Sequence, residues 1–147
     1  MLTESILALA RRSFDEIWNN GNLDTADELY SPDYVNHDPV SPEVPPGPDG
    51  VKQLAKMYRQ AFPDLRFAID EMLAAGDRVV TRWTGQGTHR GALRGLPPSG
   101  RQARVTGISI HRIAGGRIVE TWVNWDTLGM MEQLGAAQVP ARRAVGR

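Results

Sequence analysis

The sequence predicts an α+β fold in which helices cover one face of a curved antiparallel sheet. Apolar residues recur at helical spacing over roughly the first 60 residues and then alternate with polar residues from about residue 65 onward. Helices followed by a run of strands are typical of this class. A length of 147 residues fits one domain with its own core, and no internal repeat or linker divides it. We therefore expect a single domain over residues 1–137.

Three helices are expected before the strands. Thr3 can cap a helix that runs to about Asn20 and stops at Gly21, and Asn22 can cap a shorter second helix. A third helix is expected over about residues 50–61, because Pro63 ends its apolar stripe.

A loop between the second and third helices is the first candidate for the edge of a binding site. Residues 34–37 form a short extended segment, and five prolines among residues 38–48 favour a loop over a helix or a central strand. Such a loop beside Asn36 and His37 could form the rim of a cavity.

Apart from a hairpin over 101–126, four further segments complete the chain. A strand beginning near Leu65 and a strand over 78–88 are joined by a turn at 75–77, a glycine- and proline-rich loop follows at 91–100, and Thr127 to Leu134 form a short last helix. Within the strand over 78–88, alternation places Arg82, Thr84 and Gln86 on one face and Thr81 and Trp83 on the other.

A β-hairpin over 101–126 carries most of the candidate site. Gly115 and Gly116 can both take positive φ, which favours a two-residue primed turn. That turn would set His111 opposite Glu120. One face would then carry Gly107, Ser109, His111, Glu120, Trp122, Asn124 and Asp126 and would line a ligand cavity, while Ile108, Ile110, Val119, Val123 and Trp125 would pack on the other face. A slip of one residue would exchange the two faces.

Composition narrows the classes of partner. The chain has no cysteine and balances 17 basic against 17 acidic residues. Residues 138–147 hold three arginines and no acid, so residues 1–137 carry a net charge of −3, which argues against a nucleic-acid interface. We expect that basic tail to be a frayed terminus. No apolar run approaches the ~20 residues of a membrane span, and the amino terminus has no signal-peptide pattern. A cytoplasmic protein is expected.

Several motifs together resemble a known family. They are Tyr-Val-Asn-His at 34–37, Phe-Pro-Asp at 62–64, Arg-Trp-Thr at 82–84, Gly-Thr-His at 87–89, Gly-Leu-Pro-Pro at 95–98 and Gly-Gly-Arg-Ile-Val-Glu at 115–120. From about residue 4 to residue 135 the chain resembles the SnoaL-like polyketide cyclases, or ester cyclases, of the nuclear-transport-factor-2-like superfamily. The resemblance implies a cone of curved antiparallel sheet wrapped by helices, an internal cavity, and a homodimer or homotetramer formed through the sheet.

The same resemblance implies a chemistry. Family members close a ring on an anthraquinone-type polyketide ester by an intramolecular aldol reaction, without metal or cofactor, with an aspartate as general acid/base and an asparagine, a glutamine and a histidine at the substrate. The asparagine matches Asn36. The aspartate falls on Val123, the histidine on Ser109 and the glutamine on Gly107. A valine cannot move a proton.

Two other residues are therefore the candidates for proton transfer. Asp126 is the carboxylate left on the predicted cavity face, although an aspartate directly before the last helix is also a typical N-cap. His37 could act from the cavity entrance, or it could be a turn histidine bonded to its own backbone.

Other candidates would bind the ligand, and each has a plainer interpretation. Asn36, Ser109 and Asn124 can hold a substrate oxygen, whereas Trp83 and Trp122 offer flat apolar area but could equally be core. His111 could line the site or form a solvated ion pair with Glu120. Arg82 could meet an anionic ligand or pair with a carboxylate such as Glu120 or Asp126. His89 is expected at the surface.

Two functions follow from these observations. The first is an enzyme that performs acid/base chemistry, without metal or cofactor, on a small apolar or aromatic polyketide-like molecule. The second is a non-catalytic small-molecule-binding or dimerising accessory domain, which Val123 at the aspartate position favours.

Overall fold

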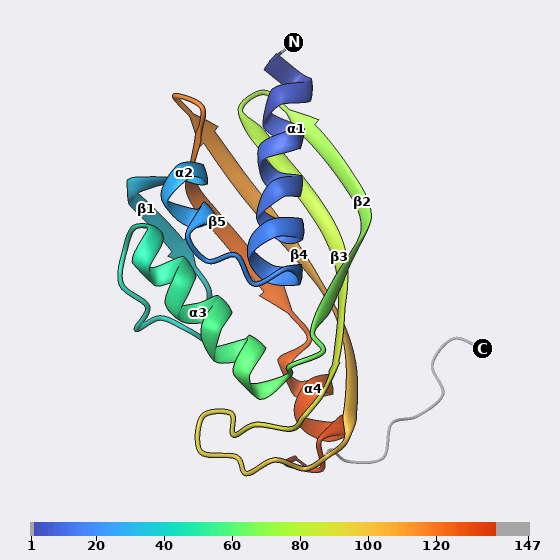
Figure 1. Cartoon of the computed structure of the whole chain (residues 1–147). Helices are drawn as coiled ribbons and strands as arrows, with labels where there is room; N and C mark the ends of the chain where they lie inside the picture. Colours follow the sequence, from blue (N-terminus) through green and yellow to red (C-terminus); the bar gives the residue numbers. More distant parts are fainter. Residues whose placement is uncertain (1, 138–147) are drawn as a thin grey trace, which may run out of the picture.

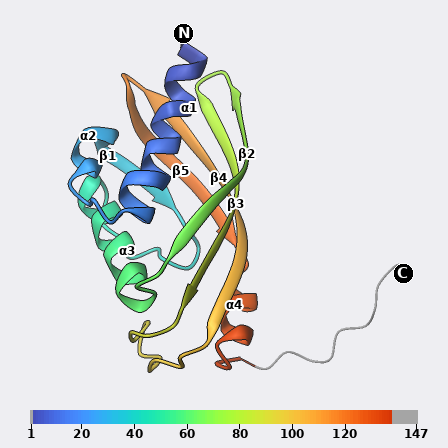
Figure 2. The ribbon, with the colours of Figure 1, turned by 45° about the vertical axis from the view of Figure 1, so that its right-hand side comes forward.

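A computed structural model describes residues 2–137, so the predicted basic tail at 138–147 lies outside the described residues. The elements in chain order are α1 (Leu2–Arg12), the π-helix η1 (Ser13–Asn19), α2 (Thr25–Leu29), β1 (Tyr30–His37), α3 (Pro48–Ala61), β2 (Arg66–Ala75), β3 (Arg78–Thr88), β4 (Gln102–Ala114), β5 (Arg117–Trp125) and α4 (Thr127–Gln133). The helices α1, with its continuation η1, α2 and α3 lie on one face of a curved sheet, and α4 lies at one end of it (Figures 1 and 2). The α+β prediction is confirmed.

The helices follow the predicted pattern with three differences. Thr3 lies inside α1, which begins at Leu2, so the prediction of a Thr3 cap is wrong. The first helix does not remain an α-helix to its end but widens into η1, and a π-helical segment of this kind is common at functional sites. The second helix begins at Thr25, and Asp24 at its N-cap position makes no side-chain capping hydrogen bond, so the prediction of an Asn22 cap is wrong. Gly21, with φ of 73°, follows the end of η1 as predicted.

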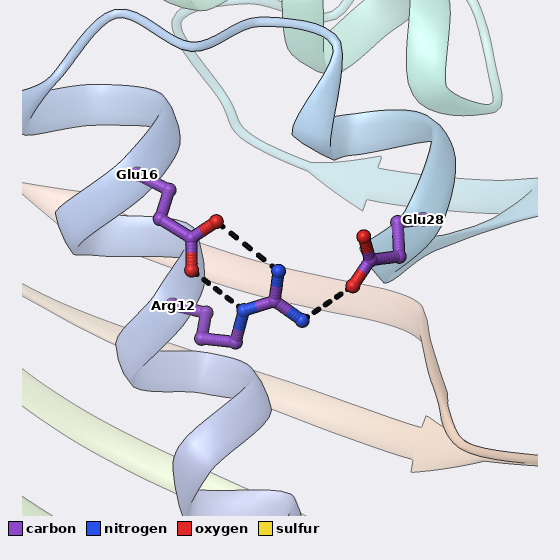
Figure 3. Close-up of polar contacts among 3 residues, drawn as sticks. All are labelled: Arg12, Glu16 and Glu28. Atoms are coloured by element: carbon purple, nitrogen blue, oxygen red, sulfur yellow. Dashed lines mark hydrogen bonds and ion pairs between the residues drawn. The ribbon is translucent and has the colours of Figure 1, made fainter.

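Two ion pairs at the surface join the end of α1 to η1 and to α2. The Arg12 guanidinium lies 2.6 Å from Glu16 and 2.5 Å from Glu28 of α2 (Figure 3). Hydrogen bonding to Arg12 lowers the pKa of Glu16. Surface pairs of this kind stabilise by at most ~1 kcal/mol each, so the packing of the helices depends mainly on their buried apolar faces.

The sheet has the strand order β1-β5-β4-β3-β2. β2 to β5 are antiparallel neighbours, but β1 joins β5 in parallel, which the prediction of an antiparallel sheet did not include. The alternation predicted for β3 holds over residues 81–83, because Thr81 and Trp83 are buried while Arg82 is exposed. Thr84, predicted on the face of Arg82, is also buried and donates to Asp70 at 2.6 Å.

The register of the β4–β5 hairpin differs from the predicted one. Gly115 and Gly116 both have positive φ, as a primed turn requires. However, Arg112 pairs with Glu120 and Ile113 with Ile118, so Val119 is an extra residue that forms a bulge. Beyond the bulge every pairing is displaced by one residue, and the β5 residues exchange faces. The prediction that His111 lies opposite Glu120 is wrong.

The concave face of the sheet is therefore built from a different set of β5 residues. His111 lies opposite Thr121, Ser109 opposite Val123 and Gly107 opposite Trp125, and these six residues share the face that the helices cover. Trp122 and Asn124 lie on the outer face with Ile108 and Ile110.

Two buried clusters hold the helices on the sheet. One joins α1, η1, α2 and α3 to β1, β3, β4 and β5 through residues such as Ile6, Ile17, Leu29 and Ile118. The other lies near α4 and includes Phe62, Leu93 and Met130. Among residues 2–137 no helix is long and apolar enough to cross a membrane.

Candidate functional site

A cavity lies between the helices and the concave face of the sheet. It has a volume of about 140 Å³, roughly ten times the space that one water molecule needs. Most of its wall is apolar or aromatic, including Phe14, Trp18, Phe67, Trp83 and Trp125. The polar side chains on the wall are Ser13, Tyr30, Tyr34, Asn36, Asp38, Tyr58, Ser109, His111 and Thr121. An apolar cavity with a few polar groups is the form that small-molecule sites take.

The π-helix η1 and strand β1 supply one side of this wall. Ser13 and Phe14 come from η1, and the Ser13 hydroxyl lies 2.6 Å from the Tyr30 hydroxyl. Burial raises the pKa of Tyr30 to about 12 and raises that of Tyr34 as well. Both phenols are therefore neutral at physiological pH and can donate or accept a hydrogen bond.

Two neighbouring strands supply the other side. Trp83 of β3 donates from Nε1 to Ser109 Oγ of β4 at 3.0 Å, and both side chains are buried. Because the Ser109 oxygen accepts this bond, its own proton is available to a ligand oxygen. Gly107 makes room for the indole, since a Cβ atom there would lie 2.3 Å from the Trp83 ring.

His111 is the only imidazole on the cavity wall among the described residues. It is 5% exposed, its ring lies edge-to-face with that of Phe14 at 6.1 Å between centroids, and Nδ1 has no hydrogen-bond partner among the described residues. Burial lowers the pKa of His111 to about 4. The ring is therefore neutral at pH 7, with one nitrogen that donates and one that accepts.

Asp38 is the only carboxylic acid on the wall in the part of the chain that the structure describes. It directly follows β1, is 6% exposed, and accepts a hydrogen bond from the Val40 amide at 3.0 Å. Burial raises the pKa of Asp38, although the Val40 amide and the charge of Arg94 act in the opposite direction. A carboxyl group placed in this way is suited to proton transfer.

Four of the residues predicted for the site lie on the cavity wall: Asn36, Trp83, Ser109 and His111. The other five lie elsewhere. Asp126 caps α4 by accepting from the Gly129 amide at 2.8 Å, which is the plainer of its two predicted roles. Arg82 is exposed and pairs with Glu71 and Asp70 rather than with Glu120 or Asp126.

The remaining three form a group on the outer face of the sheet. His37 stacks on Trp122 with 5.2 Å between ring centroids, and its Nε2 lies 2.6 Å from Glu120. Glu120 also pairs with Arg112 at 3.0 Å. Trp122 and Asn124 face this side because of the Val119 bulge. The structure therefore separates His37, Trp122 and Asn124 from the cavity.

Asp38 is the residue that the sequence interpretation missed, although a signal was present. Side chains alternate along β1, so Tyr34, Asn36 and Asp38 share one face while Val35 and His37 share the other. Extending the strand by one residue would have identified Asp38. The prediction that His89 lies at the surface is wrong: it is 1% exposed, its Nδ1 lies 3.0 Å from Ser99 Oγ, and its ring centroid lies 5.5 Å from that of Phe62. Among residues 2–137 no three His, Asp or Glu side chains form a group able to hold a metal ion.

Comparison with known proteins agrees with this architecture. Nogalonic acid methyl ester cyclase from Streptomyces nogalater is 29% identical over 119 residues, which cover 80% of this chain and 89% of that protein. The structure of TsrD from Streptomyces laurentii superposes with a TM-score of 0.83 and 29% identity over 91% of this chain and 97% of that one. IdmH from Streptomyces antibioticus superposes with a TM-score of 0.74 and 32% identity over 87% and 96%.

The family comparison covers nearly the whole described chain. The match to the family described as SnoaL-like polyketide cyclase extends over residues 8–134, from α1 through α4. This range contains every element that forms the cavity. The chain belongs to the SnoaL-like polyketide cyclase family.

Proposed function

We propose that the protein closes a ring on an aromatic polyketide ester by acid/base chemistry, without metal or cofactor, inside this cavity. One observation carries the proposal. Asp38 is the only carboxylic acid and His111 the only imidazole on the described cavity wall, and both are buried within an otherwise largely apolar and aromatic surface. An aromatic substrate would pack on that surface, with its oxygens directed at the few polar groups.

Asp38 would act as the general base. Its carboxylate takes a proton from the carbon next to the ester carbonyl, so that a C–H bond breaks and an enolate forms. The enolate carbon attacks a second carbonyl of the same molecule, a C–C bond forms, and the new alkoxide takes up the proton that Asp38 had accepted. The raised pKa of Asp38 brings it nearer to working pH and makes it a stronger base than an exposed aspartate.

His111 and Ser109 would hold the developing oxygen charge. The neutral imidazole can donate one hydrogen bond, and the Ser109 hydroxyl has its proton free because Trp83 occupies its oxygen. Preorganised donors of this kind stabilise an oxyanion. Asn36, also on the wall, is placed to orient a substrate carbonyl.

The relatives support the substrate class. The curated relative from Streptomyces nogalater is named for nogalonic acid methyl ester. The family aspartate aligns with Val123, which lines the same cavity as Asp38. A base on β1 would therefore reach the same enclosed substrate from another strand.

Turnover of nogalonic acid methyl ester by the purified protein tests the proposal. We expect wild type to convert it and Asp38→Asn to lose about 10²- to 10⁴-fold in kcat, the usual contribution of a general base. Asp126→Asn and His37→Ala, outside the cavity, are the matched controls. An Asp38→Asn variant with wild-type turnover would overturn the assignment of the base, and loss of turnover in either control would return the role to that residue.

The second candidate is a small-molecule-binding domain without chemistry. Two observations favour it: Val123 stands at the family aspartate position, and one Asp38 oxygen already accepts the Val40 amide. Trp18 and Trp83 line the cavity, so a bound aromatic ligand would quench tryptophan fluorescence. Quenching by nogalonic acid methyl ester without conversion would select this function over the first.

A further inference from the structure

The loop between β3 and β4 is held in a fixed position beside the cavity. At its base, the His89 amide donates to the Arg101 carbonyl and the Gly100 amide donates to the His89 carbonyl. At its tip, Leu93 is 2% exposed and exchanges two backbone hydrogen bonds with Leu96. Arg90 and Gly91 both donate to the last carbonyl of α3. These hydrogen bonds therefore fix the backbone at Arg94, which follows Leu93.

Arg94 reaches from this loop to the proline-rich loop that begins at Asp38. Its guanidinium donates to Ser41 Oγ at 2.8 Å and lies 3.1 Å from Glu43. Ser41 is 2% exposed, so the contact with it is not a solvent-facing surface pair. Arg94 also has a φ of 47°, and it is the only non-glycine residue among the described residues with positive φ. Such a backbone conformation persists where the surrounding contacts maintain it.

The contact with Ser41 holds the turn that begins at Asp38, whose carboxyl group accepts from the Val40 amide within the same turn. The Ser41 amide donates to the Asp38 carbonyl at 3.1 Å, so the loop turns back directly over this residue. Four ionisable side chains act on Asp38 or are acted on by it: Tyr34 of β1, Tyr58 of α3, Glu43 of the proline-rich loop and Arg94. Arg94 is the only cation among them.

We propose that Arg94 is a positioning residue that joins the two loops and thereby fixes both the place and the charge state of the Asp38 carboxylate on the cavity wall. The inference rests on the proposed function only for its catalytic consequence. Glu43 balances the arginine, since the two side chains pair while they act on Asp38 with opposite sign. The Arg94–Glu43 pair would thus set the pKa of the Asp38 carboxyl group.

Titration of the Asp38 carboxyl group tests this proposal without any substrate. Carboxyl ¹³C NMR would follow Asp38 in the full chain, with Asp38→Asn assigning the signal. We expect Arg94→Gln to raise the pKa of Asp38 by roughly one unit, because an opposite charge is removed. Arg94→Lys would retain most of the wild-type value, and Glu43→Gln would lower it because a like charge is removed. A purely structural role for Arg94 would change the melting temperature of Arg94→Gln but would not produce opposite shifts in the two neutral variants.

The pH dependence of turnover supplies the second readout. If Asp38 is the base, the acid limb of kcat/KM moves upward in pH in Arg94→Gln and downward in Glu43→Gln, in step with the NMR titration. Titrations that move while no variant converts the substrate would overturn the proposed function and leave the role of Arg94 standing. An Asp38 titration that is the same in wild type, Arg94→Gln and Glu43→Gln would overturn the role of Arg94, whatever the activity.

Discussion

Burial of His111 makes the fold sensitive to acid, by an amount that follows from the structure. The ring is 5% exposed, Nδ1 has no hydrogen-bond partner within residues 2–137, and burial lowers the pKa from 6.5 to about 4. The unfolded chain therefore takes up this proton at a higher pH than the folded protein does. The stabilisation that results is complete above pH 6.5 and is lost as the pH falls toward 4. At ~1.36 kcal/mol for each pKa unit, the loss amounts to roughly 3 kcal/mol.

Urea unfolding of wild type and His111→Asn between pH 7.5 and 4 measures this quantity. The other titrating groups are common to both proteins, so they cancel in the difference between the two free energies of unfolding. We expect that the stability of wild type relative to the variant falls by roughly 3 kcal/mol across the interval, most of it below pH 6.5. Two curves that stay parallel would refute the reasoning, because they would show that His111 is protonated equally easily in the folded and unfolded states.

Three further outcomes are expected. Gly107→Ala should destabilise the fold by about 1–3 kcal/mol in thermal or urea unfolding, because its Cβ atom would lie 2.3 Å from the Trp83 ring. Gly85→Ala should destabilise it less, because its Cβ atom would lie 3.1 Å from Phe67. Asp126→Ala should cost about 1 kcal/mol by removing the α4 cap, and a folded variant with more than tenfold slower turnover would instead place Asp126 in the chemistry. Ile108 is 50% exposed on the outer face of the sheet. If the expected homodimer or homotetramer forms through this face, Ile108→Asp should yield monomers in light scattering. An unchanged mass would place the interface elsewhere.

The distribution of charge and apolar area also agrees with the proposed ligand, an uncharged aromatic molecule. The arginines that form ion pairs, such as Arg12, Arg82 and Arg112, are part-exposed or lie on the outer face, and none of the three lines the cavity. Inside, the polar side chains of the described wall are hydroxyls, one amide, one imidazole and one carboxyl group. A site of this composition favours a ligand with an aromatic body and several oxygens over a highly charged one.

The local elements of this protein follow from the amino-acid sequence alone. Apolar spacing and the stop at Gly21 predicted the first helix, alternation predicted the faces of residues 81–83 in β3, and two adjacent glycines predicted the turn of the hairpin. Each of these features depends on residues within one or two turns of each other, so the local sequence contains the cause. The motifs carried the family assignment in the same way.

The composition of the site, in contrast, depends on contacts between segments that are distant in the chain. The Val119 bulge exchanged the faces of β5, and it lies where β5 receives β1 as a parallel neighbour, a pairing between residues more than 80 positions apart in the chain. The burial of Asp38 depends on a loop that Arg94 holds from more than 50 positions away. Such contacts form only when distant segments pack together, because their free energy comes from burial and pairing across the sheet rather than from the preference of any one segment.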